Sequence, residues 1–396
     1  MCSDMKLSIL NTKLQALALF RGLLKDPVIQ GLVDFLAENG STDEKISKYA
    51  QFVSLLYGQT PCALARYVEN AVNDTENPYI KRVGQSLTPD TEMEEALWQE
   101  LSVLQLVADL TPEDMCAELG TDSYLPKFPV EKVDIVASYR ERMEQIGKHG
   151  YGIYAKYRMF YINSQNQIVP VKNPDKVRLS SLVSYEQEKK VIMDNTNALL
   201  EGRPAANILL TGDAGTGKSS TIKAVVNELY TKGLRILEVR KDQLREIPAI
   251  LDELNTNPLK FILFIDDLSF QKDDDNFSAL KAILEGSVSA KSSNVVIYAT
   301  GNRRHLVKET FSDRDGDDIH RNDTMQEIIS LSERFGIQLT FQKPTKQVYL
   351  EIVHNLAKTK GLNMDEAELD MLAERFAINR GGRSARAANQ FVDTLL

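Results

Sequence analysis

Eight residues, 212–219, constrain the fold of this chain most strongly. They run Gly-Asp-Ala-Gly-Thr-Gly-Lys-Ser and match the pattern G-x-x-x-x-G-K-[ST] at every specified position. The apolar run 207–210 precedes them, and a segment with helical spacing, 220–230, follows. In such an arrangement the glycines let backbone N–H groups turn inward, and the helix N-terminus adds partial positive charge. The run therefore predicts a phosphate-binding loop, or P-loop, in an α/β domain.

This loop predicts ATP and Mg²⁺ as ligands. Lys218 would reach the β and γ phosphates, and the Ser219 hydroxyl would hold Mg²⁺. The glycine order differs from G-x-G-x-x-G, which disfavours a dinucleotide site. The residues expected around the phosphates are Gly212, Asp213, Ala214, Gly215, Thr216, Gly217, Lys218, Ser219 and Ser220.

A second motif is the apolar run 261–265, which ends in Asp266 and Asp267. A buried strand that ends in carboxylates is the form expected of a Walker B segment. Consecutive side chains of a strand point to different sides, so the two acids can have different roles. We expect Asp266 to hold the Mg²⁺ shell and Asp267 to polarise the attacking water. Most such ATPases carry Glu at the second position, so the shorter Asp267 leaves the efficiency of hydrolysis open.

The order of apolar segments predicts the domains. After Pro204, short apolar runs alternate with helical stretches, which is typical of a parallel sheet covered on both faces. We expect an all-α N-terminal domain at 1–150 and a β-hairpin linker at 151–178. A P-loop ATPase core at 179–343 and a small C-terminal helical lid at 344–396 would follow.

Composition excludes several classes of protein. The net charge of −9 over 396 residues disfavours a protein that holds nucleic acid by neutralising many phosphates. Three widely spaced cysteines fit neither a disulfide framework nor a zinc site. Signal-peptide and membrane-span patterns are absent, so we expect a cytoplasmic protein with no membrane contact.

In their order along the chain, these motifs resemble an AAA+ (AAA-type) P-loop ATPase. More narrowly, the chain is similar to a family of predicted bacterial ATPases catalogued as a domain of unknown function (DUF815). The resemblance covers about residues 180–396. The segments that carry it are 212–220, 261–270, 280–286, 297–306, 330–336 and 382–386.

The resemblance implies roles for further residues. Asn302 would be the sensor that positions the hydrolytic water beside the γ phosphate, since an amide can both donate and accept hydrogen bonds. Arg334 matches the place from which such subunits present an arginine finger to a neighbour's ATP. Arg383 or Arg386 would be the lid arginine that senses the γ phosphate, and the sequence does not choose between them. The family typically has Gly where this chain has Ala385, which hardly affects either charge.

Three hypotheses about function stay open at this point. The first is an ATP-driven machine that remodels or loads a partner, with hydrolysis at the interfaces of a homo-oligomer. The second is a nucleotide-dependent binding switch with little turnover, in which the N-terminal helices hold an unknown protein partner. The third is a nucleic-acid-associated ATPase similar to a helicase loader, in which Arg303, Arg304 and His305 touch phosphates. The acidic composition disfavours the third.

Overall fold

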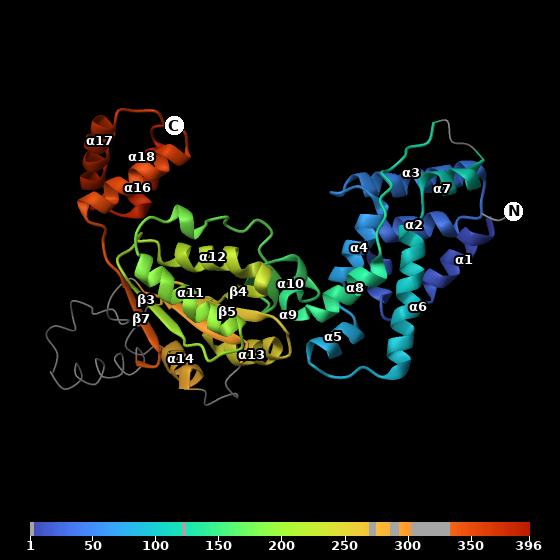
Figure 1. Ribbon diagram of the computed structural model, residues 1–396, viewed down its shortest axis with the longest axis horizontal. Helices are drawn as coiled ribbons and strands as arrows, with labels where there is room; N and C mark the ends of the chain where they lie inside the picture. Colours follow the sequence, from blue (N-terminus) through green and yellow to red (C-terminus); the bar gives the residue numbers. More distant parts are fainter. Residues whose placement is uncertain (1–3, 121–123, 269–274, 286–292, 302–332) are drawn as a thin grey trace. The chain divides into compact units, whose positions relative to one another are not determined.

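The computed structural model describes residues 4–120, 124–268, 275–285, 293–301 and 333–396. The chain divides into two units, Met1–Lys156 and Tyr157–Leu396. Figure 1 shows the helices of the first unit and the sheet and helices of the second. Each unit has its own buried apolar core, and the second contains a separate cluster in the C-terminal helices. Among the residues described, no helix is long and apolar enough to cross a membrane.

The first unit is helical, as the sequence predicts. Several helices begin at the capping residues that their sequences supply: Ser41 and Glu44 form a capping box, as do Thr111 and Asp114. The helices are α1 (Asp4–Gln15), η1 (Arg21–Lys25), α2 (Pro27–Ala37), α3 (Thr42–Tyr57), α4 (Leu64–Asp74), α5 (Pro78–Gly84), α6 (Thr91–Ala108), α7 (Pro112–Leu119), α8 (Ile135–Glu144), α9 (Ile146–His149) and α10 (Ile153–Lys156).

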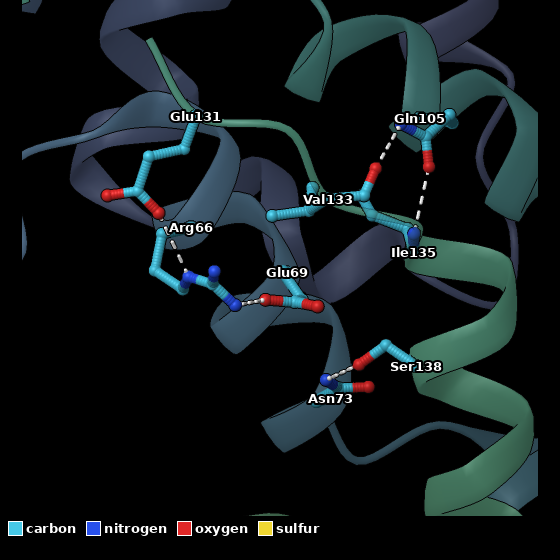
Figure 2. Close-up of polar contacts among 8 residues, drawn as sticks. All are labelled: Arg66, Glu69, Asn73, Gln105, Glu131, Val133, Ile135 and Ser138. Atoms are coloured by element: carbon cyan, nitrogen blue, oxygen red, sulfur yellow. Dashed lines mark hydrogen bonds and ion pairs between the residues drawn. The ribbon is translucent and has the colours of Figure 1, made fainter. Parts of the chain in front are cut away.

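Side chains of α4 and α6 hold the segment that leads into α8 (Figure 2). The Gln105 amide donates to the Val133 carbonyl at 3.0 Å and accepts from the Ile135 N–H at 2.8 Å. The Asn73 amide donates to the Ser138 hydroxyl at 2.7 Å. The Gln105 bonds thus hold the end of the non-helical segment and the first residue of α8, and the Asn73 bond holds α8 itself.

A buried carboxylate on α6 supports the turn after α1. Glu100 is 8% exposed. Its two oxygens accept hydrogen bonds from three consecutive backbone N–H groups, those of Ala18 at 2.8 Å, Leu19 at 3.1 Å and Phe20 at 2.9 Å. Backbone N–H groups that are buried without a partner are costly, so this single side chain is required for the turn to be buried.

The second unit is built on a seven-stranded sheet in the order β2-β1-β4-β5-β6-β3-β7. The pair β1–β2 is antiparallel, and all the other pairs are parallel. The strands are β1 (Met159–Ile162), β2 (Ile168–Pro170), β3 (Ile208–Gly212), β4 (Leu234–Glu238), β5 (Lys260–Ile265), β6 (Val295–Thr300) and β7 (Ile337–Phe341).

Helices cover this sheet, and the predicted α/β fold class is confirmed. Side chains of α11 and α12 join one face of the sheet in a single apolar cluster. Alternate residues of the same strands, such as Leu209, Leu263 and Ile297, are equally buried, so the second face is covered too. The helices of this part are η2 (Leu179–Ser181), α11 (Glu186–Leu200), α12 (Lys218–Leu229), η3 (Tyr230–Lys232), η4 (Lys241–Glu246), α13 (Ile247–Asn255) and α14 (Asp275–Glu285).

The hairpin expected within residues 151–178 lies inside this sheet. β1 pairs in parallel with β4, with Met159 opposite Ile236, so the hairpin extends the sheet instead of forming a separate connector. The Gln243 amide donates to the carbonyls of Ile162 at 3.2 Å and Asn163 at 3.3 Å and so holds the hairpin against η4. Within the expected range 151–178, residues 153–156 form the short helix α10, and the first strand begins at Met159.

Three helices form the C-terminal lid. They are α16 (Lys346–Thr359), α17 (Glu366–Asn379) and α18 (Ala385–Asp393). Their inward faces share an apolar cluster that includes Tyr349, Val353 and Phe391. The lid follows β7 directly, after residues 342–345.

We expect Glu100→Ala to destabilise the first unit by about 3 kcal/mol, because three backbone N–H groups, of which that of Phe20 is buried, lose a charged acceptor. Trp98, the one tryptophan of the chain, lies on the same helix and reports on this unit. Urea unfolding followed by Trp98 fluorescence measures the change. Glu95→Ala, at an exposed position of α6, is the matched control and should shift the midpoint little. Equal midpoints for the two variants would contradict this role of Glu100.

Candidate nucleotide-binding site

The predicted phosphate loop lies between β3 and α12, at the carboxyl edge of the sheet. β3 pairs with β6 on one side and with β7 on the other, whereas β4, the next strand in the sequence, lies three positions away. In open α/β sheets, ligands bind outside the carboxyl ends of the strands at such a change in strand order. The tertiary structure therefore places residues 212–219 where a parallel sheet offers a ligand crevice.

Gly212 is required by the contact between β3 and β7. Its φ is +134°, a value that L side chains rarely adopt. A Cβ at this position would lie 2.0 Å from the carbonyl oxygen of Phe341. The first glycine of the motif thus allows two adjacent strands to approach each other where the loop begins.

Lys218 is folded against the loop that it follows. The side chain is 6% exposed, and its Nζ donates to the carbonyls of Gly212 at 2.9 Å and Asp213 at 2.7 Å. Burial lowers the pKa of the ammonium group, and the nearby carboxylates of Asp213, Asp266 and Asp267 act in the opposite direction. An ammonium group held among carbonyls at the start of a helix is placed to exchange those partners for phosphate oxygens.

The Asp266 carboxylate, directly after β5, meets the first turn of α12. Ser219 Oγ donates to Asp266 Oδ1 at 2.7 Å, although the two residues are far apart in sequence. Thr300, at the end of β6, donates to the same oxygen at 2.6 Å. A hydroxyl and a carboxylate side by side are hard oxygen ligands of the kind that Mg²⁺ prefers, with phosphate and water completing the shell. The residues present therefore fit a magnesium ion that is bound together with a nucleotide.

Asp267 adopts an unusual backbone conformation. Its φ is +54°, in the left-handed region, which Asp tolerates better than most residues. Its N–H donates to Thr300 Oγ1 at 3.0 Å, and its side chain is exposed. Strained residues of this kind cluster at ligand sites and persist where the surrounding structure determines them.

The lid reaches the P-loop through the start of α18. The Arg386 N–H donates to the Gly215 carbonyl at 3.3 Å, and a Cβ on Gly215 would lie 3.1 Å from Arg386 Cβ. Arg383, in contrast, binds Glu374 of the lid through two hydrogen bonds of 2.8 and 2.6 Å. Of the two lid arginines named from the sequence, Arg386 adjoins the phosphate loop, and Arg383 is paired within the lid.

Arg334 lies at the opposite edge of the sheet from the P-loop. It precedes β7, which runs parallel to β3 with Ile337 opposite Ile208 and Phe341 opposite Gly212. The five residues of β7 separate the two edges by about 16 Å at the usual rise of a strand. Arg334 is therefore not brought together with the P-loop of its own chain.

The predicted sensor Asn302, together with Arg303, Arg304 and His305, lies outside the described residues. The strand before it, β6, is described to its end. Thr300 pairs with Leu210 in β3, and the Gly301 N–H donates to the Leu210 carbonyl at 2.8 Å. The end of β6 thus lies directly beside the strand that precedes the P-loop.

Two further residues, Thr300 and Tyr185, lie at this site and were not predicted from the sequence. Tyr185, just before α11, has a φ of +64°, and its ring lies 4.6 Å from that of Phe341. Its hydroxyl donates to the Gln342 carbonyl, at the start of the connection to the lid. Burial raises the pKa of Tyr185 to about 12, and a cavity of about 340 Å³ that Lys343 and Val348 also line opens beside it. A single Tyr or Thr has no sequence pattern that would reveal such contacts.

The parallel sheet with its P-loop, the acidic end of β5 and the helical lid define a P-loop fold of the AAA type. The chain belongs to the family described as "Protein of unknown function (DUF815)", whose profile matches residues 154–396. The family recognised from the sequence is confirmed, and the match begins earlier than the predicted resemblance and includes the β1–β2 hairpin.

Solved structures of AAA proteins resemble this chain at low sequence identity. The Holliday junction branch migration motor RuvB of Thermotoga maritima matches at 18% identity and a TM-score of 0.37, over 55% of this chain and 63% of that one. A chain from the HORMA:CdnC:Trip13 complex of E. coli MS115-1 matches at 14% identity and a TM-score of 0.38, over 57% of this chain and 93% of that one. This chain thus spans less than two thirds of the RuvB chain. A search of curated proteins found no match.

We expect Gly212→Ala to lower the thermal midpoint of the nucleotide-free protein more than Gly217→Ala does. Both positions have positive φ, at +134° and +96°, but only at Gly212 would the added Cβ collide with backbone. Overpacking of this kind costs about 1–3 kcal/mol beyond the strain that the two variants share. Differential scanning calorimetry without nucleotide tests the difference, and identical midpoints would show that β7 moves away at no cost.

Proposed function

We propose that this chain is a Mg²⁺-dependent ATP hydrolase of the AAA+ class. The observation that carries the proposal is the contact of Ser219 with Asp266 beside the buried Lys218. P-loop ATPases need these three groups at one point: an ammonium for the phosphates, and a hydroxyl and a carboxylate for the metal shell. Here they come from one loop and from a strand two positions away from β3 in the sheet.

Each residue has a defined part in the proposed reaction. Lys218 and the N–H groups of residues 213–220 bind the phosphates, while Ser219 and Asp266 hold Mg²⁺. When bound with ATP, Mg²⁺ would neutralise charge that develops on the β and γ phosphates. Asp267 orients and polarises the attacking water, and we keep Asn302 as the second group that positions this water.

The lid completes the site in this proposal. Arg386 is the arginine that senses the γ phosphate, because the start of α18 contacts Gly215 and because the Arg386 charge is near enough to lower the pKa of Lys218. Arg383 instead pairs with Glu374, whose pKa this bond lowers. The lid would then respond to the γ phosphate through Arg386, while the pair of Arg383 with Glu374 would stabilise the lid itself.

Arg334 supports an assembly of several copies. An arginine at the amino edge of the sheet cannot stabilise charge on the γ phosphate at the carboxyl edge of the same chain. It can reach the site of a neighbour if copies pack with the amino edge of one against the carboxyl edge of the next, as in a ring. We therefore propose a homo-oligomer in which Arg334 acts in trans.

The charge distribution favours a protein partner over nucleic acid. Residues 1–156 hold 15 Lys and Arg against 23 Asp and Glu, a net charge of −8, and the remaining residues are nearly neutral. An acidic helical unit repels phosphate backbones and attracts basic surfaces. We propose that hydrolysis drives remodelling or loading of a protein that this unit binds.

A nucleotide-dependent binding switch is the second candidate. The observation that favours it is Asp267. Most such ATPases have Glu at this position, and the shorter Asp267 also has a left-handed backbone conformation. A carboxylate that reaches less far would activate water poorly and leave ATP bound for longer. In this case occupancy of the site, and not turnover, would control the partner.

We expect ATPase activity whose specific rate rises with protein concentration, because the proposed site needs Arg334 from a neighbour. Lys218→Ala should abolish ATP binding, whereas Arg334→Ala should bind ATP normally and lose about a thousandfold in kcat. Steady-state phosphate release over a range of protein concentrations, with Asp267→Asn beside these variants, is the measurement. A wild-type protein that binds ATP but never releases phosphate would support the switch and exclude the hydrolase.

We expect Arg386→Ala to weaken ATP binding about tenfold more than ADP binding, because only ATP has a γ phosphate for the charge to meet. Arg383→Ala is the matched control: it removes the same charge three residues earlier in the lid, just before the N-cap of α18. It should leave the ratio of ATP to ADP affinity unchanged and should lower the thermal midpoint, since Glu374 loses its partner. Titration of both variants with fluorescent ATP and ADP analogues decides the assignment, and a reversed pattern would assign the sensor to Arg383.

A further inference from the structure

Thr300 joins the end of β6 to the acidic end of β5 through three hydrogen bonds. Its hydroxyl donates to Asp266 Oδ1 at 2.6 Å and accepts from the Asp267 N–H at 3.0 Å. Its carbonyl accepts from the Leu268 N–H at 2.7 Å. Thr300 is 2% exposed, and its hydroxyl uses both its donor and an acceptor site, so its orientation is determined.

Thr300 and Ser219 donate to the same acceptor oxygen, but a bound metal ion would affect the two hydrogen bonds differently. Both donate to Asp266 Oδ1, at 2.6 and 2.7 Å. The Ser219 hydroxyl is itself a proposed metal ligand, so its bond to Asp266 can be exchanged when an ion binds. The Thr300 bond comes from the neighbouring strand and needs no exchange, so it can keep the carboxylate in place throughout.

The backbone at Asp267 gives a second reason to single out Thr300. A left-handed residue persists only where its surroundings hold it. The N–H groups of Asp267 and Leu268 both bond to Thr300, on either side of the residue whose φ is +54°. Thr300 therefore restrains both the Asp266 carboxylate and the backbone turn that orients the Asp267 side chain.

We propose that Thr300 is a positioning residue for the Asp266–Asp267 pair. It touches neither nucleotide nor metal: it holds Asp266 for the Mg²⁺ shell and sets the direction of Asp267 toward the attacking water. The inference rests on the proposed function of this site and extends it to how the pair is held.

The test compares Thr300→Val, Thr300→Ala and Thr300→Ser in the full-length protein. Val keeps the shape and loses the hydroxyl, Ala loses the hydroxyl with less crowding, and Ser keeps the hydroxyl. Thr196→Val is the matched control, because Thr196 is fully buried in the same unit and its hydroxyl bonds to Ile192 and Tyr298, away from the acids. The readouts are ATP affinity with and without Mg²⁺, kcat, and the thermal midpoint.

We expect Val and Ala at position 300 to leave Mg²⁺-free ATP affinity within about twofold of wild type. The gain in affinity that Mg²⁺ provides, and kcat, should each fall roughly tenfold or more, since hydrogen bonds to a charged group are lost. Thr300→Ser should restore both to within about threefold. Thr196→Val should lower only the thermal midpoint.

Unchanged Mg²⁺ dependence and kcat in Val and Ala variants that are folded would overturn the inference. So would an equal loss of Mg²⁺-free binding, which would make Thr300 a general packing residue, or a failure of Ser to restore the readouts. If the wild type shows no turnover, the proposed hydrolase fails on its own. The Mg²⁺ dependence of ATP binding then decides the role of Thr300 by itself.

Discussion

One carboxylate oxygen, Asp266 Oδ1, is the point on which the site depends. It accepts hydrogen bonds from the first turn of α12 and from the last residue of β6, while its own residue directly follows β5. Three segments that are distant in sequence meet there because parallel strands all end at the same edge of their sheet. A phosphate loop without this contact would bind an anion at a helix N-terminus but would have no fixed place for a metal ion.

The sheet separates the functions of its two edges. The carboxyl edge carries the P-loop, the acidic pair and the contact with the lid at Gly215, whereas Arg334 lies at the amino edge. Of the proposed groups that the described residues contain, one chain therefore supplies all those around the phosphates except the arginine finger. In the proposed oligomer, a neighbour adds the missing charge, which ties activity to assembly.

The N-terminal unit is built independently of this chemistry. Its core is a separate apolar cluster, and the buried Glu100 supports a turn within the same unit. The family profile begins at residue 154, so it leaves this unit out. Its excess of acidic residues is a property of its surface that can differ while the nucleotide site stays the same.

The sequence by itself determined the features that short-range spacing encodes. The P-loop is a continuous run, and a buried strand with two acids at its end can be recognised from adjacent residues. The α/β class predicted from these runs is confirmed, and the structure brings Ser219 and Asp266, two of the residues expected around the ligand, into contact. The family could be recognised for the same reason, since its motifs are local.

The tertiary structure alone decided what depends on pairing between distant segments. It made the β1–β2 hairpin part of the sheet, turned Arg383 toward Glu374 and placed Arg386 beside Gly215. It also set Thr300 against Asp266 and put Arg334 at the far edge. Strand order and the docking of the lid come from the burial of apolar faces over the whole unit. A single Thr or Arg contributes little to this apolar burial. The partners of such a residue are therefore known only from the folded structure.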